Sequence, residues 1–395
     1  MKVLYFMNHV DQGGAALALY DLIVEMKKDS SIVPIVITGK YNRLNQMLSE
    51  INVENYSASF KNFESSKKSP VWMFKLFLKI RYTIGQYIAI HKIERLIDFS
   101  KVDIIHSNLN RIDIGAILSK KYNIPHIWHV REHADGSDFA LMSVKKNPIK
   151  YMETFKSNYI YISQSVKQAW DKKGLDDKKG RIIYDGVRTE LYQPLQHEQR
   201  EKIHMIFLGG YTENKGQENL IDALKEMPND MKKRLVIDFY GNGKKKYVDY
   251  LKKKIIENNL TEVMNIYPYR EDISEKVPEY DVGLTCSRTE GFGRVTVEYM
   301  MSGLCPIASA EGGTLEIVKH GETGILYDST NKKALCDAVI WAINNQKLIH
   351  EMGKKAEKSA KQEFSMTKHV KEIKNLYCEV LSNEQSKIFN NSSDL

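Results

Sequence analysis

Two glutamates eight residues apart are the first residues whose type and spacing could do chemistry. The segment Glu290-Gly291-Phe292-Gly293-Arg294-Val295-Thr296-Val297-Glu298 follows directly on the apolar run Val282–Thr285. If a helix begins near Arg294, the glycines leave backbone N–H groups open to a sugar or phosphate, and Glu298 lies one turn inside the helix. Alone, such a pair is more typical of a solvated helix face, so its neighbours decide between the two interpretations.

Glycines also follow two other apolar runs of the second half. Gly209-Gly210 ends the run Ile203–Leu208, and Lys215-Gly216 then opens the next helical segment with a lysine directed at the turn. Glu311-Gly312-Gly313-Thr314 follows the run Cys305–Ala308. Because ligands of parallel sheets bind at the carboxyl ends of the strands, three such loops predict a single anion-binding site.

The first half carries less specific signals. Gly13-Gly14 could be an ordinary helix start or a turn open to an anion, and both interpretations stay open. His126 and His129 alternate along a strand, which sends them to opposite faces and argues against a metal cluster with Glu132-His133. His106 ends the preceding strand, where we expect it to line the cleft without a chemical role assigned to it.

Several common classes of site are excluded. The sequence contains no GxGxxG turn, no GxxxxGK[ST] loop and no pair of aspartates two residues apart. These absences argue against a dinucleotide oxidoreductase, a P-loop enzyme and a transferase that holds its metal with a DxD pair. We therefore expect no cofactor and no metal.

The elements that must position these residues alternate along the 395-residue chain. Short apolar runs separated by helical periodicity predict two doubly wound α/β domains with parallel sheets that meet near Leu191–Glu201. We expect a last helix at Met366–Leu381 and a frayed tail at Gln385–Leu395. The expected strands are Lys2–Phe6, Val33–Ile37, Asp103–His106, His126–Trp128, Tyr159–Ile162, Arg181–Tyr184, Ile203–Leu208, Leu235–Tyr240, Met264–Tyr267, Val282–Thr285, Cys305–Ala308 and Gly324–Tyr327.

The net charge of +8 is concentrated in residues 61–101, which hold nine basic and three acidic residues. This concentration argues against a general nucleic-acid coat. Four unevenly spaced cysteines favour a reducing compartment, and neither a signal peptide nor a transmembrane helix is predicted. The segment also has a helical apolar stripe that would face either the protein core or an anionic membrane surface; it consists of Met73, Leu76, Phe77, Ile80, Ile84, Tyr87 and Ile88.

With these motifs in place, the chain resembles the retaining glycosyltransferases of the GT-B fold, family 4. The resemblance lies in Glu290 and Glu298 of a Glu-x7-Glu motif, in Lys215-Gly216, in Gly312-Gly313 with Glu316, and in Tyr184-Asp185-Gly186-Val187. It implies two Rossmann-like domains facing a cleft, with the last helix crossing back to the first. The acceptor-side domain would then comprise residues 1–190 plus 366–395, and the nucleotide-sugar domain residues 191–365.

The resemblance also implies residue roles. Glu298 would hold the ribose hydroxyls, Lys215 the diphosphate, and Glu290 with the Phe292-Gly293 backbone the transferred sugar. His129 would lie beside that sugar, although an ordinary core or surface histidine remains the alternative. Gly210 stands where many members carry an arginine and Asp185 where an asparagine is common, so Lys215, helix N-termini and Arg294 or Arg131 would meet the phosphate charge. The implied catalytic residues are Glu290, His129 and Lys215, and the implied donor-binding residues are Gly13, Gly14, Lys215, Gly291, Phe292, Gly293, Arg294, Glu298, Gly312, Gly313 and Thr314.

The implied activity is transfer of a sugar from a nucleotide diphosphate, with UDP expected, to a glycan or lipid-linked acceptor in bacterial surface polysaccharide synthesis. Such an enzyme would be cytoplasmic, bind no nucleic acid and be able to dock on the inner face of the plasma membrane. Two alternatives remain at this point: a sugar-nucleotide epimerase on the same fold and a non-catalytic partner of another transferase.

Overall fold

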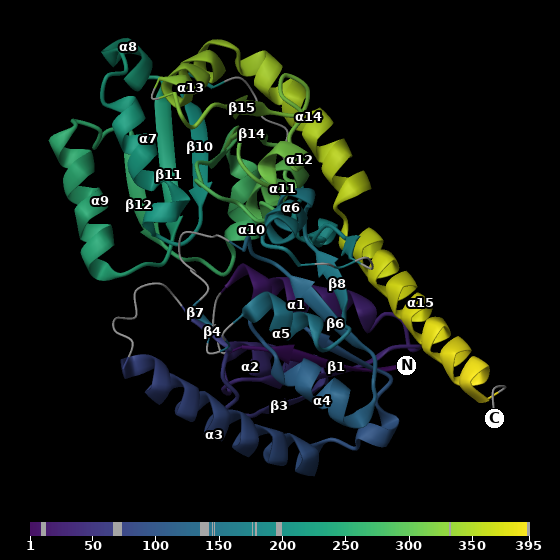
Figure 1. The fold of residues 1–395 in the computed structure, drawn as a ribbon. Coiled ribbons are helices and arrows are strands. Elements are labelled where there is room, and N and C mark those ends of the chain that lie inside the picture. The colour runs from purple at the N-terminus through teal and green to yellow at the C-terminus, as the bar shows by residue number, and fades with distance from the viewer. Residues whose placement is uncertain are drawn as a thin grey trace. The chain divides into compact units, whose positions relative to one another are not determined.

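The computed structural model describes residues 1–8, 13–65, 73–134, 142–143, 145, 147–175, 177, 180–194, 200–331 and 333–392. They form two compact units, Met1–Gly186 with Met366–Leu395 (unit 1) and Val187–Ser365 (unit 2). The first boundary falls before Val187 rather than after residue 190, because the Val187 N–H donates to the Phe364 carbonyl of unit 2 at 2.9 Å. Each unit carries its own parallel sheet with helices around it, as the fold class predicts (Figure 1).

Unit 1 is built on a seven-stranded sheet in the order β3-β2-β1-β5-β6-β8-β9. Apart from the two edge strands, every strand of this sheet is buried beyond its first residue, as parallel strands covered on both faces must be. The sequence did not predict β3, whose Glu-Asn-Tyr-Ser segment has no apolar run and lies at the edge. The strands are β1 (Lys2–Met7), β2 (Val33–Thr38), β3 (Glu54–Ser57), β5 (Ile104–Ser107), β6 (His126–Val130), β8 (Asn158–Tyr161) and β9 (Arg181–Ile182), with β4 (Glu64–Ser65) and β7 (Met142–Ser143) as a separate antiparallel pair.

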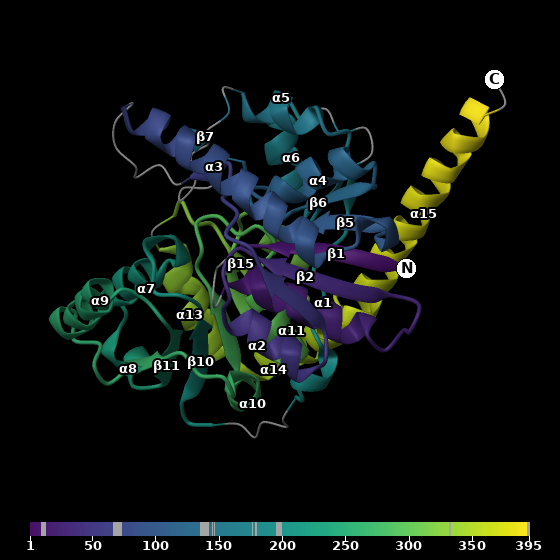
Figure 2. The ribbon, with the colours of Figure 1, turned by 90° about the horizontal axis from the view of Figure 1, so that it is seen from below.

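The last helix belongs to unit 1 and packs on its first helix. Tyr377 reaches the core, where its hydroxyl lies 3.0 Å from that of Tyr5. The expected frayed tail is wrong as far as Ser392, because the helix continues to that residue and extends beyond the sheet (Figure 2). The helices are α1 (Gly14–Met26), α2 (Arg43–Glu50), α3 (Met73–Leu96), α4 (Ile114–Tyr122), α5 (Pro148–Glu153), α6 (Gln164–Lys172) and α15 (Met366–Ser392), with a 3-10 turn η1 (Phe99–Lys101).

Unit 2 has a six-stranded parallel sheet in the order β12-β11-β10-β13-β14-β15. Alternate residues of its central strand β10 divide between two apolar clusters, Met205 and Phe207 on one face and Ile206 and Leu208 on the other. Both faces are therefore covered by helices, and the strand ends are left for loops. The strands are β10 (Ile203–Leu208), β11 (Leu235–Gly241), β12 (Met264–Pro268), β13 (Val282–Thr285), β14 (Cys305–Ser309) and β15 (Ile325–Tyr327).

The helices of unit 2 fall into two layers. α7, α9 and α13 contribute to the cluster that contains Phe207, while α10 and α11 contribute to the cluster that contains Leu208. The helices are α7 (Gln217–Leu224), α8 (Asn229–Lys232), α9 (Lys245–Glu257), α10 (Ile273–Lys276), α11 (Arg294–Met301), α12 (Thr314–Ile317), α13 (Ala334–Asn344) and α14 (Gln346–Glu363), with 3-10 turns η2 (Thr189–Leu191), η3 (Glu213–Lys215) and η4 (Val277–Glu279).

Candidate active site

Lys215 and Glu290 meet at the carboxyl ends of β10 and β13. The Lys215 ammonium lies 3.1 Å from Glu290 Oε2, and their side chains are 36% and 17% exposed, so a ligand can reach both. The loop that carries Lys215 is held close by Gly216, which has a φ of +79° and whose added Cβ would lie 2.0 Å from the Cys286 carbonyl oxygen. A side chain at residue 216 would therefore push Lys215 away from Glu290.

The Glu290–Glu298 segment forms a turn and the start of α11. The helix begins at Arg294, as the sequence predicts, and its N-cap is Gly293 with a φ of +104° and no side-chain cap. A helix N-terminus without a side-chain cap is a favourable place for an anion. Glu298 lies one turn inside and accepts from Arg294 Nε at 3.3 Å. Phe292 is buried, with its ring edge-on to Phe364 at 5.6 Å.

The glycine loop after β14 packs directly on this turn. The Gly313 N–H donates to the Glu290 carbonyl at 2.8 Å, and a Cβ on Gly312, whose φ is +57°, would lie 2.3 Å from the same oxygen. A Cβ on Gly313 would lie 2.2 Å from the Phe292 carbonyl oxygen. Thr314 completes the loop by donating its hydroxyl to the Ser309 and Glu311 carbonyls. The loop that carries Glu290 and the loop that carries Gly312 are therefore packed tightly against each other.

Gly209 and Gly210 end β10 beside the same lysine. Gly209 has a φ of +147°, and a Cβ there would meet the Lys215 side chain at 3.8 Å. Gly210 is exposed, and its carbonyl accepts from the buried Gln217 side chain at 3.0 Å. No motif of the sequence marks Gln217, although a polar residue directly after Lys215-Gly216 at a helix start is a signal for a residue of this kind.

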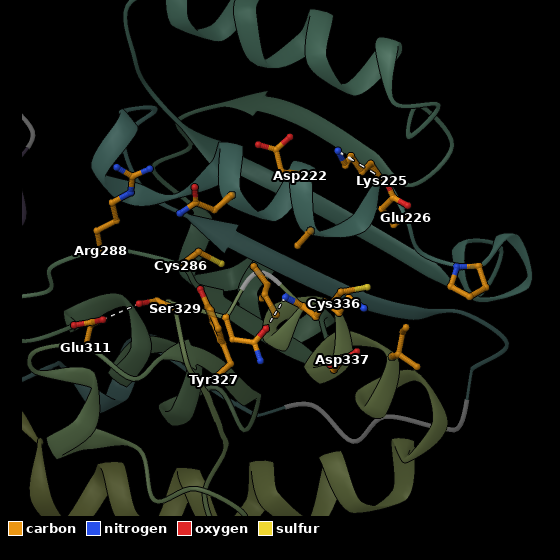
Figure 3. A pocket seen from close by; sticks show the side chains of 17 residues that line it. Asp222, Lys225, Glu226, Cys286, Arg288, Glu311, Tyr327, Ser329, Cys336 and Asp337 are labelled. Atoms are coloured by element: carbon orange, nitrogen blue, oxygen red, sulfur yellow. Dashed lines mark hydrogen bonds and ion pairs between the residues drawn. The ribbon is translucent and has the colours of Figure 1, made fainter.

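A cavity of about 1090 Å³ lies between α7 and α13 of unit 2 (Figure 3). Cys286, Arg288 and Glu311 line it, so it adjoins the loops that carry Glu290 and Gly312. Glu311 accepts from the Ser329 hydroxyl at 2.7 Å. The sequence did not predict this cavity, because it depends on the spacing between two helices more than a hundred residues apart.

The Gly13-Gly14 turn lies in unit 1, where residues 9–12 before it are outside the described residues. Gly13 caps α1 with extended backbone, and a Cβ on Gly14 would meet nothing within 4 Å. Asn108 ties this helix start to β6: its amide donates to the Ala15 carbonyl at 3.0 Å, and its Oδ1 accepts from Arg131.

Arg131 and Asp185 form a buried ion pair in unit 1. One guanidinium nitrogen contacts both carboxylate oxygens, at 2.6 and 2.7 Å. The side chains are 3% and 8% exposed. The Arg131 charge is thus offset within the unit, which leaves Lys215 as the better candidate for the phosphate charge.

His129 is buried beside this pair and is held in one tautomer. Arg131 Nη2 carries only donors and lies 3.4 Å from His129 Nδ1, so Nδ1 accepts and the proton sits on Nε2. Among the described residues, nothing hydrogen-bonds His129 Nε2. Burial, with Arg131 nearby, holds the pKa of His129 well below its usual range, so the ring is neutral.

The sequence-based expectation that His106 lines the cleft is wrong. It is fully buried, with Nε2 3.2 Å from His129 Nδ1 and Nδ1 2.6 Å from the Tyr377 hydroxyl of α15. His106 is buried because α15 covers this end of β5. The sequence near His106 could not predict this, since α15 lies at the other end of the chain. Burial, assisted by the Arg131 charge, lowers the pKa of His106 well below normal.

His126 points to the other face of β6, as strand alternation predicts. Its ring nitrogens contact the Ser107 and Ser157 hydroxyls at 2.9 and 2.6 Å, and burial lowers its pKa to about 3. Glu132 pairs with Arg111 at 2.6 Å and His133 with Ser165 at 2.7 Å. Across the described part of the chain, no three His, Cys, Asp or Glu side chains are placed to hold a metal ion.

Comparison with known proteins identifies the second unit. Residues 189–359 match the family model described as "Glycosyl transferases group 1". The chain is a glycosyltransferase with a group 1 domain. Its fold is GT-B, since the structure of Anabaena Alr3699/HepE in complex with UDP and glucose superimposes with a TM-score of 0.78 at 20% identity, covering 96% of this chain and 100% of that one.

Two other relatives of this glycosyltransferase are also named glycosyltransferases. An uncharacterized glycosyltransferase, MJ1178 of Methanocaldococcus jannaschii, is 28% identical over 349 residues, which are 83% of this chain and 91% of the relative. The capsular polysaccharide biosynthesis glycosyltransferase CapH of Staphylococcus aureus is 21% identical over 64% of each chain. Within the described residues, no helix is long and apolar enough to span a membrane.

Proposed function

We propose that this glycosyltransferase moves a sugar from a nucleotide diphosphate, with UDP the expected nucleotide, to a hydroxyl of a glycan or lipid-linked acceptor in surface polysaccharide synthesis. The observation that carries the proposal is the partly exposed Lys215–Glu290 pair between three glycine loops at one edge of the unit 2 sheet. UDP in the HepE structure and the capsular role in the name of CapH support the choice of donor and pathway class.

The donor would lie on unit 2, with its diphosphate against Lys215 and the N-termini of α7 and α11. Both helices begin at positive-φ glycines without side-chain caps, so their N–H groups and dipoles favour an anion. Lys215 would turn from Glu290 to the phosphates, which frees Glu290 for the sugar hydroxyls. Glu298, 14% exposed, would accept from the ribose hydroxyls.

We infer that transfer retains the anomeric configuration by attack on the same face. The bond from the anomeric carbon to the phosphate oxygen breaks, the bond to the acceptor oxygen forms, and the leaving phosphate takes the acceptor's proton. Lys215 and the helix N-termini stabilise the charge on that phosphate, each key donor contributing about 3 to 4 kcal/mol.

No metal enters this scheme, because Lys215 and the helix N-termini supply the positive charge that a divalent cation supplies elsewhere. The sequence has no DxD pair to hold one. A cytoplasmic enzyme docked on the inner face of the plasma membrane would meet a lipid-linked acceptor there.

A thermal-shift screen with UDP-, GDP- and dTDP-sugars tests the proposal. Ligand at 100 times its dissociation constant stabilises a protein by about 2.7 kcal/mol, so a UDP-sugar is expected to raise the melting temperature most. Incubation with donor alone then separates the alternatives: a transferase returns unchanged or slowly hydrolysed donor, and an epimerase returns an isomeric sugar. Absence of stabilisation by every nucleotide sugar at millimolar concentration would contradict the proposal.

A further inference from the structure

The α3 helix turns an apolar stripe toward solvent. Figures 1 and 2 show the helix on the outside of its unit. The side chains of its exposed stripe fall on one helical face, at the i, i+3, i+7, i+10 and i+11 spacing. They are Phe77 (57% exposed), Ile80 (51%), Ile84 (54%), Tyr87 (65%) and Ile88 (59%). Met73 and Leu76, which the sequence places on the same face, have side chains outside the described part of the structure.

The rotation of α3 is fixed by polar contacts on its opposite face. The Tyr82 hydroxyl donates to Asp113 Oδ2, and the Gln86 amide donates to Asp113 Oδ1 at 2.7 Å. The Lys61 N–H donates to Gln86 Oε1 at 3.1 Å, and Ile93 packs in the core. The core-facing interpretation of the stripe is therefore wrong, because the buried face is the one that carries Tyr82 and Gln86.

Basic side chains surround the α3 stripe. Lys79, Arg81, Lys92 and Arg95 are exposed on the same helix. The helix has a single acid, Glu94, whose carboxylate is shared with Lys121 at 2.5 Å. An outward surface that combines large apolar residues with positive charge is complementary to anionic headgroups over acyl chains.

We propose that the α3 stripe docks this glycosyltransferase on an anionic lipid bilayer, with the helix lying in the plane of the interface. Contiguous apolar surface of this kind on a soluble protein marks an interaction site. A second copy of the chain fits the charges less well, since a two-fold contact would place the same basic residues opposite one another. Tyr87 suits a bilayer interface, because its ring is apolar and its hydroxyl polar.

Vesicle flotation tests this docking. The wild-type protein is expected to float with phosphatidylcholine vesicles containing 30% phosphatidylglycerol and to float much less with phosphatidylcholine alone. Ile84→Ser with Ile88→Ser should lower the partition coefficient at least about tenfold. The matched control is Ile256→Ser, at a 63% exposed position on α9 of unit 2, which should change it less than twofold.

A set of charge-removing variants tests the contribution of the basic side chains on α3. Arg81→Gln, Lys92→Gln and Arg95→Gln together should remove most of the preference for anionic vesicles while leaving weak binding to both kinds. Lys245→Gln, Lys246→Gln and Lys252→Gln, at exposed positions of α9, are the matched control and should leave the preference intact. A wild-type protein that stays unbound at low salt overturns the proposal. Normal flotation of the Ile84→Ser, Ile88→Ser variant also overturns it. The same holds if the wild-type protein sediments as a dimer and this variant as a monomer, because the stripe would then be a contact between two copies of the chain.

The inference rests on the proposed function in one respect: a lipid-linked acceptor is the reason for the enzyme to bind a membrane. Donor binding is measured separately, because all α3 variants should retain the thermal shift with the nucleotide sugar. Loss of flotation with an intact donor shift supports the docking surface. Flotation that survives while no nucleotide sugar binds contradicts the proposed function and leaves the docking surface standing.

Discussion

The two units hold their candidate site residues by different means. In unit 2 the loops are positioned by backbone: Gly216, Gly312 and Gly313 let carbonyls of neighbouring loops approach where a Cβ would lie within 2.3 Å of them. In unit 1 the side chain of His129 is positioned by other buried side chains, Arg131 and His106, which Asp185 and Tyr377 hold in turn. We therefore expect unit 2 to be sensitive to small steric changes and unit 1 to protonation.

The largest effect is expected for Gly216→Ala. A Cβ would overlap the Cys286 carbonyl and force an unfavourable φ, which displaces Lys215 from the donor. We expect transfer to fall at least about 100-fold, or about 2.7 kcal/mol in the barrier. Gly14→Ala, whose Cβ meets nothing within 4 Å, should keep the wild-type melting temperature. A wild-type transfer rate in Gly216→Ala would show that the close approach of the two loops does not position Lys215.

Acidification should destabilise unit 1. The folded pKa of His126 is depressed to about 3, so its contribution to stability is present above the unfolded pKa of about 6.5 and is lost as the pH falls toward 3. Between pH 7 and pH 5 the loss from this residue is about 2 kcal/mol. His106 and His129 act in the same direction, whereas Asp113, whose pKa burial raises to about 6, opposes them by at most one proton.

Urea unfolding at both pH values, followed through the buried Trp128 and Trp170 of unit 1, measures this loss. His126→Gln should reduce it by about 2 kcal/mol. His91→Gln, with its side chain 50% exposed, is the matched control and should leave the loss unchanged. An unaltered pH dependence in His126→Gln would show that this ring is not the neutral buried group described.

A smaller effect is expected for Tyr377→Phe. The variant removes the hydroxyl that contacts His106 Nδ1 and the Tyr5 hydroxyl and leaves both without that partner in the core. The free energy of unfolding should fall by about 1.5 kcal/mol. Tyr41→Phe, at a 57% exposed position, serves as the control. Wild-type stability in Tyr377→Phe would mean that α15 is not held to β5 through this network.

The smallest effect is expected for metal removal. If Lys215 and the helix N-termini supply the charge at the phosphates, EDTA should change the transfer rate less than about twofold. Loss of activity with EDTA and its recovery with magnesium or manganese would contradict the metal-free proposal.

The sequence predicted the strands of unit 2 and the start of α11 at Arg294, because both depend on local signals, namely apolar runs and glycine turns. It could not predict the surroundings of His106, since Tyr377 is 271 residues away. The sequence also could not predict which face of α3 is buried, because both faces carry apolar residues. The buried face is set by the hydrogen bond from Gln86 to Asp113, which lies 27 residues further along the chain. Edge strand β3 was missed for want of an apolar run.

The central claim is that unit 2 binds a nucleotide diphosphate with separate tasks for its two motif glutamates. Calorimetric titration of UDP tests it most directly. Glu298→Ala should weaken UDP binding by about 10- to 100-fold through loss of the ribose contact, a cost of about 1.4 to 2.7 kcal/mol. Glu290→Ala should stay within about threefold, since it only releases Lys215 toward the phosphates, and yet it should impair sugar transfer.

Glu257→Ala, at an exposed position of α9, is the control and should bind UDP as the wild type does. The predicted result is strong loss of UDP affinity in Glu298→Ala with near-normal affinity in Glu290→Ala. Equal loss in both variants, or no UDP binding by the wild-type protein, would contradict the account.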